Sequence, residues 1–270
     1  MIEKKHGKPN PRFENFSWRP GTATWLARQL RKTQSVLFWS MDEVTYTYEH
    51  HKTHYERDDT VSVFLNAYDV EKERQFIKRI DRYLPKDQVR LLDIGCGLGL
   101  HASLWAERNK KVTASDFSTK FRDYIVEHYD FPFIWTDVLN CSIKEQYDIC
   151  FCMAIATIQV DEKARFQTFE NLARLVRIGS FLVLVSPSNQ RVFDIRSRRA
   201  ALHALDRRDF EKLEELGLGI ERVFHWSTSP RSMWRSPASR WLANCIEEVG
   251  AKVGIGARKV VICRRREVTQ

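Results

Sequence analysis

The stretch that decides the fold is LLDIGCGLG, residues 91–99, in which three alternating glycines follow an aspartate. The run VRLLDI (89–94) that leads into it is short and apolar, which is typical of a buried strand. Glycines directly after a strand let the backbone take positive φ and approach a ligand closely, because no Cβ intervenes. Ligands of open parallel sheets bind at the carboxyl ends of the strands. The stretch therefore predicts the ligand-binding loop of an α/β protein.

The rest of the chain repeats an alternation of helices and strands. A helix is expected from Asp59 or Thr60 up to Pro85, and after Pro187 we expect helical residues within 191–217 and a helix at about 238–249. Further strands are expected at 111–116, 133–137, 147–155, 180–187, 222–228 and 258–266, and further helices at 100–110, 119–129 and 161–177. Such an order favours βαβ units and a mostly parallel sheet with helices on both faces.

The residues around the glycines limit which ligand the loop can hold. No lysine follows Gly99, so the loop is not the phosphate-binding loop of nucleoside triphosphatases. GLGLHA, read from Gly97, does fit the looser dinucleotide fingerprint. Asp93 argues against a dinucleotide, because a carboxylate about 4 Å from a phosphate costs several kcal/mol at an effective dielectric constant of about 20. A ligand that carries an ammonium or sulfonium group is favoured instead.

At these residues the sequence resembles the class I S-adenosylmethionine-dependent methyltransferases. Their first motif, a strand that ends in acidic-x-Gly-x-Gly-x-Gly, is matched by residues 93–99. The resemblance covers about residues 75–188, with a closing pair of strands at 222–228 and 258–264. It implies a doubly wound α/β fold with a mostly parallel seven-stranded sheet, helices on both faces, an N-terminal helical lid and an antiparallel last strand. The expected domains are an arm and lid (1–75), a cofactor-binding core (76–190) and a C-terminal substrate-side insertion with the closing strands (191–270).

The resemblance also assigns roles to three aspartates. Asp93 would serve the methionine end of S-adenosylmethionine, Asp116 in VTASDFS the ribose hydroxyls, and Asp137 in WTDV the adenine amino group. Three acidic residues that end three consecutive expected strands are a stronger signal than any one of them, although glycines that only make a tight turn remain the alternative. The expected cofactor contacts are Asp93, Gly95, Cys96, Gly97, Gly99, Asp116, Phe117, Asp137, Val138 and Met153.

Less of the sequence bears on the methyl acceptor. Methyltransferases of nucleobase amino groups carry an Asn/Asp-Pro-Pro-aromatic turn after the fourth strand, where this chain reads MAIATIQV. A general base helps only when the acceptor is protonated, and the segment VTYTYEHHKTHYE (44–56) offers His50 and His54 at i, i+4 spacing. Solvated surface histidines are the alternative; a metal pair would lack a third ligand, so no metal site is expected.

Three aromatic residues and one arginine are the candidate acceptor contacts. Tyr48 and Tyr55 belong to the same histidine-rich segment, and Trp234 and Arg235 lie in a stretch of interleaved tryptophan and arginine, residues 226–241. Such interleaving suits an anionic or nucleic-acid ligand. Ordinary core tryptophans covered by arginine stems would give the same pattern.

Charge and composition limit the possible partners, the location and the state of the cysteines. The net charge is +9, and residues 187–270 hold 17 basic and 10 acidic residues, which indicates an anionic partner or a solvated basic surface. No run approaches the roughly 18 apolar residues of a membrane span, and the N-terminus lacks the apolar core of a secretory signal, so a cytoplasmic location is expected. The six cysteines form no CxxC pair and are expected to be free thiols.

These patterns together predict an enzyme. We expect an S-adenosylmethionine-dependent methyltransferase that acts on an oxygen or nitrogen of a small or medium-sized metabolite, with an anionic acceptor as one option. The alternatives are an RNA or protein methyltransferase, suggested by the basic C-terminal third, and a non-catalytic binding module with the same fold. Nucleic acid is not the favoured partner, and the oligomeric state is not predicted.

Overall fold

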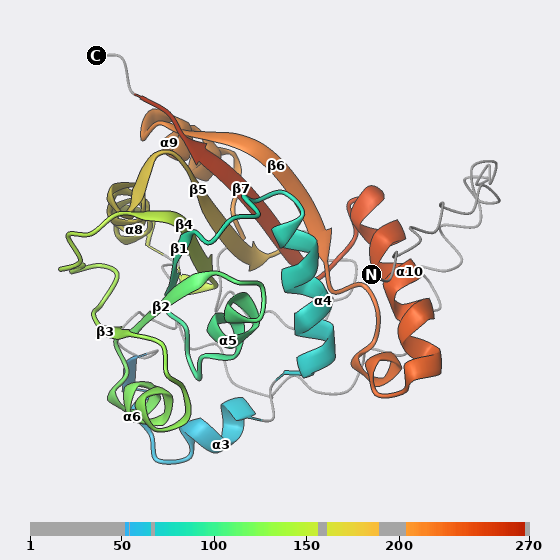
Figure 1. Ribbon diagram of the computed structural model, residues 1–270. Helices are drawn as coiled ribbons and strands as arrows, with labels where there is room; N and C mark the ends of the chain where they lie inside the picture. The colour runs from blue at the N-terminus through green and yellow to red at the C-terminus, as the bar shows by residue number, and fades with distance from the viewer. Residues whose placement is uncertain (1–51, 54, 66–67, 156–160, 189–203, 268–270) are drawn as a thin grey trace, which may run out of the picture. The chain divides into compact units, whose positions relative to one another are not determined.

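The computed structural model describes residues 52–53, 55–65, 68–155, 161–188 and 204–267 (Figure 1). The chain divides into two units, Met1–Trp39 and Ser40–Gln270, and every described residue belongs to the second. No helix among the described residues is long and apolar enough to cross a membrane.

A seven-stranded sheet in the order β3-β2-β1-β4-β5-β7-β6 forms the centre of this unit. Strands β1 to β5 pair in parallel, whereas β7 is antiparallel to both β5 and β6. The expected α/β fold with an antiparallel last strand is confirmed. The strands are β1 (Arg90–Ile94), β2 (Lys111–Asp116), β3 (Phe133–Trp135), β4 (Tyr147–Met153), β5 (Val176–Pro187), β6 (Leu218–Trp226) and β7 (Arg258–Arg265).

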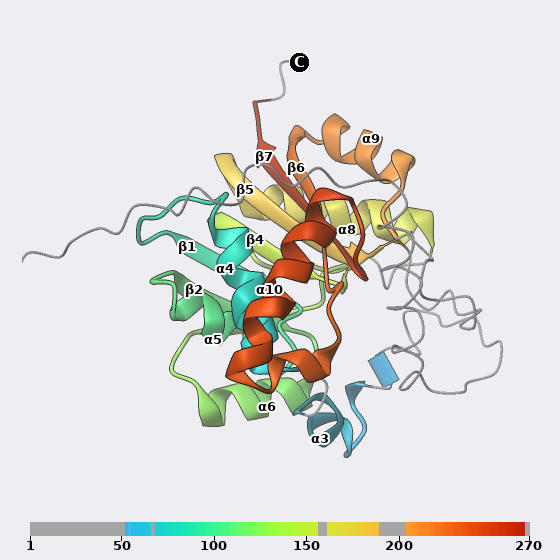
Figure 2. The ribbon, with the colours of Figure 1, turned by 90° about the vertical axis from the view of Figure 1, so that its right-hand side faces the viewer.

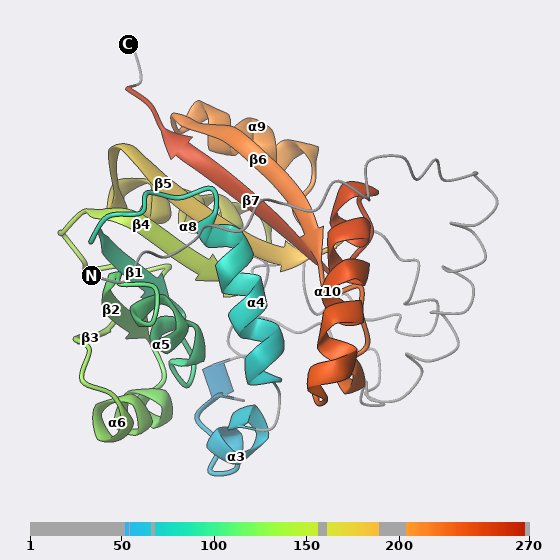
Figure 3. The same ribbon diagram turned by 45° about the vertical axis from the view of Figure 1, so that its right-hand side comes forward.

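Helices cover both faces of the sheet because successive strand residues point to opposite sides. Leu91 packs in the core beneath α4, α5 and α10, and its neighbour Leu92 packs in the core beneath α8 and α9. Figures 2 and 3 show α10 beside α4 on one face, with α8 and α9 on the other. The helices are α3 (Thr60–Leu65), α4 (Val70–Asp81), α5 (Leu100–Ala106), α6 (Thr119–His128), α8 (Glu162–Leu175), α9 (Arg207–Glu215), the 3₁₀ helix η2 (Arg231–Trp234) and α10 (Pro237–Lys252).

The continuous helix expected before Pro85 was wrong. Helix α3 ends at Leu65, and α4 begins only at Val70. The reason is Asp69, which has an extended backbone and whose side chain accepts a hydrogen bond from the backbone N–H of Lys72 at 3.1 Å. An aspartate that caps a helix in this way competes with helix formation before it. The break places Tyr68 in a connecting segment, from which its side chain reaches the site described below.

Smaller differences concern the ends of the strands. β6 begins at Leu218 instead of residue 222, and β3 has only three residues. Because β6 and β7 come from the C-terminal segment, that segment completes the sheet of the core. The expected domain boundaries remain predictions.

Candidate functional site

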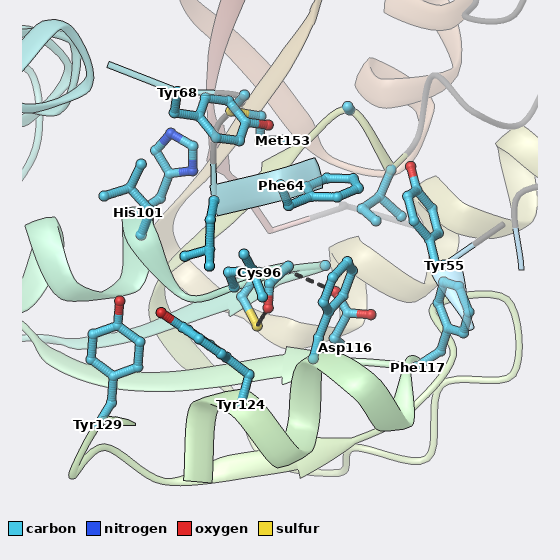
Figure 4. A pocket seen from close by; sticks show the side chains of 18 of the residues that line it. Tyr55, Phe64, Tyr68, Cys96, His101, Asp116, Phe117, Tyr124, Tyr129 and Met153 are labelled. Carbon is cyan, nitrogen blue, oxygen red and sulfur yellow. Dashed lines mark hydrogen bonds between the residues drawn. The ribbon is translucent and has the colours of Figure 1, made fainter. Parts of the chain in front are cut away.

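A cavity of about 250 Å³ lies at the carboxyl ends of β1, β2 and β4 (Figure 4). The loop after β1 lines it with Gly95–Leu98, the end of β2 with Asp116 and Phe117, and the end of β4 with Met153–Ile155. Aromatic residues from the segment before α4, from α6 and from the loop after α6 complete the wall. The cavity is therefore at the edge where an open parallel sheet binds its ligands.

The glycine loop is held by the neighbouring strand. The backbone N–H groups of Gly95 and Cys96 both donate to the carbonyl of Ser115, at 2.7 and 3.0 Å. Gly97 has a φ of +54°, which disfavours side chains, and a Cβ built there would meet nothing within 4 Å. The loop thus leaves open space directly above Gly97 in which a ligand can lie against the backbone.

Asp93, at the end of β1, is a buried carboxylate that lacks one partner. It is 1% exposed, and the backbone N–H of Ala102 donates to it, but no group among the described residues bonds to its Oδ2. Burial, together with the charge of Asp116, raises the pKa of Asp93 to about 8. A buried carboxylate oxygen without a partner is costly, and a cationic group at this position would remove that cost.

Asp116, at the end of β2, connects the glycine loop to the cavity wall. Its Oδ2 accepts from the backbone N–H of Gly97 and its Oδ1 from that of Ser118, both at 3.0 Å. Burial raises its pKa to about 6, although these backbone hydrogen bonds oppose the shift. A carboxylate has about four acceptor positions, so Asp116 can also accept from ligand hydroxyls. The unpaired Asp93, the open space at Gly97 and the acceptors of Asp116 fit a ligand with an ammonium group and a ribose.

An aromatic cluster closes the side of the cavity where Asp116 lies. Tyr55 packs against Phe64 of α3, Phe117 and Phe121, with ring centroids 5.5 to 5.9 Å apart. Glu56 fixes this segment to the start of α6, because its carboxylate accepts from the backbone N–H of Thr119 at 2.9 Å and from its hydroxyl at 2.6 Å. The segment that contains Tyr55 is therefore held against the cavity wall, and the lid expected there stays a prediction.

The structure brings together most of the predicted cofactor residues. Gly95, Cys96, Gly97, Asp116, Phe117 and Met153 line the cavity, and Asp93 stands directly before the loop. Gly99 lies below it, where an added Cβ would approach the rings of Tyr129 and Phe131.

Besides Asp93 and Gly99, two more predicted cofactor residues do not line the cavity. Val138 is 4% exposed and belongs to the core beneath α8. Asp137 pairs with Lys52, with Nζ and Oδ2 2.7 Å apart, and its Oδ1 accepts from the backbone N–H of Leu139. The Asp137 carboxylate is thus already engaged at the edge of the site.

Of the predicted acceptor and catalytic residues, one lines the cavity and the others do not or lie outside the described residues. Tyr55 lines the cavity, whereas Tyr48, His50 and His54 lie outside the described residues. Trp234 is fully buried beside Trp226 and donates from Nε1 to the hydroxyl of Ser229 at 2.8 Å. Arg235 is exposed and does not line the cavity. Trp226 and Trp234 are therefore core residues, as the alternative interpretation of the pattern held, whereas Trp241 is 67% exposed.

The sequence interpretation missed the polar end of the cavity. Tyr68 and His101 line it, and their rings meet edge to face at 5.6 Å. His101 lies two residues after Gly99, so its place next to the motif could have drawn attention. Its partner Glu73 is on α4, and nothing in the local pattern of that helix indicates a role at the site.

The charge of the lining bears on the ligand. Among the described lining residues, Asp116 is the acidic residue and none is lysine or arginine. The basic excess of the C-terminal third is therefore not concentrated on the described cavity wall.

Comparisons with known proteins agree with this site. A family model described as a methyltransferase domain matches residues 91–179. A search of curated proteins gave no significant match. Among solved structures, the chain is similar to the N-methyltransferase NodS from Bradyrhizobium japonicum, in complex with S-adenosylhomocysteine, at 16% identity and a TM-score of 0.57 over 82% of this chain and all of that one.

Two further structures have the same fold. Magnesium protoporphyrin IX methyltransferase from Synechocystis, with bound S-adenosylmethionine, is 15% identical with a TM-score of 0.56, over 83% of this chain and all of the other. The [4+2]-cyclase SpnF is also 15% identical, with a TM-score of 0.58 over 85% of this chain and all of that one. At these identities the likenesses establish the fold and leave the reaction to the site.

Proposed function

We propose that the chain is a class I, Rossmann-like, S-adenosylmethionine-dependent methyltransferase, because residues 91–179 match a methyltransferase domain and the cavity lies at its glycine loop. It binds S-adenosylmethionine there and transfers the methyl group to an oxygen or nitrogen of a small or medium-sized acceptor. The observation that carries this proposal is the unpartnered Oδ2 of Asp93, buried directly before a glycine loop with open space above Gly97.

The residues of the site divide the work of binding. Asp93 receives the ammonium group of the ligand, which favours the ionised carboxylate and offsets the burial that raises its pKa. Asp116 accepts from the ribose hydroxyls while it keeps the glycine loop in place through the N–H of Gly97. Phe117 and Tyr55 cover the nucleoside side and exclude water from it. The bound cofactor supplies an electrophilic methyl group, so the protein mainly has to align the acceptor with it.

The lining also favours one class of acceptor. An anionic acceptor would need a cation, and none of the described lining residues is lysine or arginine. Phe64, Tyr124 and Tyr129 instead offer apolar rings and hydroxyls. We therefore favour an uncharged, partly aromatic acceptor over the anionic one that the net charge suggested.

Calorimetry with S-adenosylmethionine and S-adenosylhomocysteine tests the first half of the proposal. We expect both to bind with one site per chain, and NAD to bind at least about a hundredfold more weakly, because its diphosphate would meet Asp93. Failure of both adenosyl ligands to bind would overturn the proposed function.

Transfer of a labelled methyl group to a metabolite pool tests the second half. We expect label in an uncharged oxygen or nitrogen acceptor that the apolar lining can hold. Tight cofactor binding with label recovered in RNA or protein, or in no acceptor, would contradict the small-molecule reaction and favour the alternatives.

A further inference from the structure

Helix α10 presents an apolar face to the outside of the molecule. Trp241, Cys245 and Val249 follow one another at i, i+4 and i+8, so they form one stripe along the helix. Leu242 and the C-cap residue Val253 lie beside this stripe. The exposed fractions are 67% for Trp241, 48% for Leu242, 42% for Val249 and 55% for Val253. We call these five residues the outer face of α10.

The opposite face of α10 is fixed against the protein by polar and small residues. Glu247 accepts from the backbone N–H groups of Thr228 and Ser229, both at 2.9 Å. Gly250 lies so close to Thr228 that an added Cβ would come within 2.2 Å of its hydroxyl oxygen. A surface helix usually turns its apolar side to the core. In α10 that order is reversed, and these contacts prevent the helix from rotating to bury its outer face.

The place of α10 in the fold leaves the outer face open. Figures 1 and 2 show α10 beside α4 at the periphery of the described elements. The large exposed fractions of its apolar side chains agree with this place. Several large apolar side chains that are exposed together are typical of a surface that binds a partner.

Basic residues border the outer face. Arg235, two residues before α10, and Lys252, in its last turn, are exposed. Arg240 is half-buried and donates from Nε to the carbonyl of Trp234 at 2.8 Å. None of these three cations forms an ion pair with a described carboxylate. Their charges are therefore available to a partner.

The acids near this helix already have basic partners. Glu248 on α10 pairs with two arginines at the end of α4, and Arg82 is one of them, at 3.3 Å. Glu71 on α4, which the charge of Arg240 also reaches, pairs with Arg74 at 3.0 Å. The apolar outer face is thus bordered by positive charge, and the charge complementary to it is negative.

An apolar stripe with a basic border matches the surface of an anionic membrane. In helices that lie in the membrane interface, tryptophan and aliphatic side chains enter the acyl boundary, and basic residues meet the anionic headgroups. A second copy of this chain fits less well, because a two-fold axis would bring the basic borders of both helices together. An acidic protein would need a preformed groove for one convex helix, whereas lipids adapt to its shape.

We propose that the outer face of α10 binds the surface of an anionic phospholipid membrane. The helix lies flat on the bilayer, with Trp241 and the aliphatic side chains below the headgroups and the three basic residues at the phosphates. None of the residues of the outer face lines the cavity. Membrane binding therefore does not depend on the proposed methyl transfer, and it needs no bound cofactor.

Sedimentation of the full chain with vesicles tests this partner. Vesicles of equal parts phosphatidylglycerol and phosphatidylcholine should bind the chain at least about tenfold more tightly than vesicles of phosphatidylcholine alone, and salt should reduce the difference. We expect the same result with and without S-adenosylhomocysteine. Equal binding to the two kinds of vesicle, or binding to neither, would overturn the proposal.

Charge variants separate this surface from the overall basic charge. Arg235→Gln combined with Lys252→Gln should weaken binding to the anionic vesicles about 25-fold, from about fivefold for each charge. The control Arg207→Gln with Arg208→Gln removes two charges from exposed side chains of α9, on the other face of the sheet, and should weaken binding by less than about threefold. Equal losses would mean that only the net charge attracts the chain, which contradicts the proposal.

Tryptophan fluorescence reports whether the outer face enters the bilayer. Brominated phospholipids should quench the emission of the bound chain, and Trp241→Phe should remove most of this quenching. The control Trp135→Phe changes a tryptophan on β3 that is 59% exposed, and it should leave the quenching in place. Trp241→Ala should also weaken vesicle binding about tenfold or more. Quenching that persists in Trp241→Phe would place another surface on the membrane and would refute the assignment.

A second copy as the occupant would give a different result. Sedimentation velocity without lipid would then show a dimer that Trp241→Ala dissociates, and the wild type would not bind vesicles, which overturns the proposal. Calorimetry with S-adenosylhomocysteine on the same samples keeps this failure distinct from a failure of the proposed function, because the outer face lies outside the cavity.

Discussion

Two buried carboxylates in this chain have opposite surroundings. Glu247 on α10 is 0% exposed, and its oxygens accept from the backbone N–H groups of Thr228 and Ser229 at 2.9 Å, with Lys72 3.7 Å away. Asp93 is 1% exposed but has an oxygen with no partner among the described residues, and a second acid, Asp116, nearby. The protein donates hydrogen bonds to both oxygens of Glu247. One oxygen of Asp93 has no donor among the described residues, and a positively charged group would stabilise it.

We infer that the buried charge of Glu247 serves the fold, whereas that of Asp93 serves a ligand. Glu247 joins α10 to the segment after β6 and, through Lys72, to α4, so its cost of burial is offset within the structure. For Asp93, which lies beside the cavity, no described residue offsets the free-energy cost of burial in this way. Changing each carboxylate to its isosteric amide should therefore give opposite outcomes.

The largest effect is expected at Glu247. Glu247→Gln places an amide N–H donor where two backbone N–H groups already donate and removes the charge that faces Lys72. We expect the free energy of unfolding to fall by about 3 kcal/mol, measured by urea denaturation. The affinity for S-adenosylhomocysteine of the folded fraction should stay within about twofold. A stable variant that had lost this affinity would reverse the contrast.

Asp93→Asn should show the reverse. Without the carboxylate the ammonium group has no counter-charge, so we expect the calorimetric affinity for S-adenosylhomocysteine to fall about thirty- to a hundredfold. The free energy of unfolding should not fall by more than about 1 kcal/mol, since the amide spares the buried oxygen its charge. Tighter binding by this variant would refute the assigned role.

The same carboxylate predicts a pH dependence of stability in the free protein. Because burial raises the pKa of Asp93 to about 8, its contribution is fully present below the unfolded pKa and is lost as the pH rises through about 8. Asp116 acts in the same sense up to about 6. The stability of the wild type relative to Asp93→Asn should thus decline between about pH 4 and about pH 8, by about 1 kcal/mol or more, as measured by urea denaturation at each pH. A flat difference would mean that Asp93 is compensated like Glu247.

The smallest effect is expected at Asp137, which resembles neither extreme. Its carboxylate already pairs with Lys52 and caps the turn at Leu139. Asp137→Asn should weaken S-adenosylhomocysteine binding by less than about threefold and stability by less than about 1 kcal/mol. A loss as large as that of Asp93→Asn would show that Asp137 leaves Lys52 for the ligand.

The sequence predicted those parts of the molecule that depend on local patterns. The alternation of apolar runs predicted all seven strands, and LLDIGCGLG with Asp116 predicted the loop and its edge of the sheet. These succeed because a strand of period two and a glycine turn are specified by neighbours in the chain.

What the sequence did not predict depends on contacts between distant residues. Arg258 fixes Glu73 from 185 positions away, and no local pattern indicates that pairing. The helical period of residues 61–84 concealed the break at Asp69, since a single capping side chain decided it. Trp234 was ambiguous because a buried and an exposed tryptophan beside arginines share one pattern.

A crystal structure with S-adenosylhomocysteine would show whether Asp93 receives the ammonium group of the ligand. We expect the ammonium nitrogen within about 3 Å of Oδ2 of Asp93, or one water away, and the ribose hydroxyls on Asp116. An adenosyl ligand whose ammonium group lies elsewhere, or a dinucleotide whose diphosphate occupies the glycine loop, would contradict it.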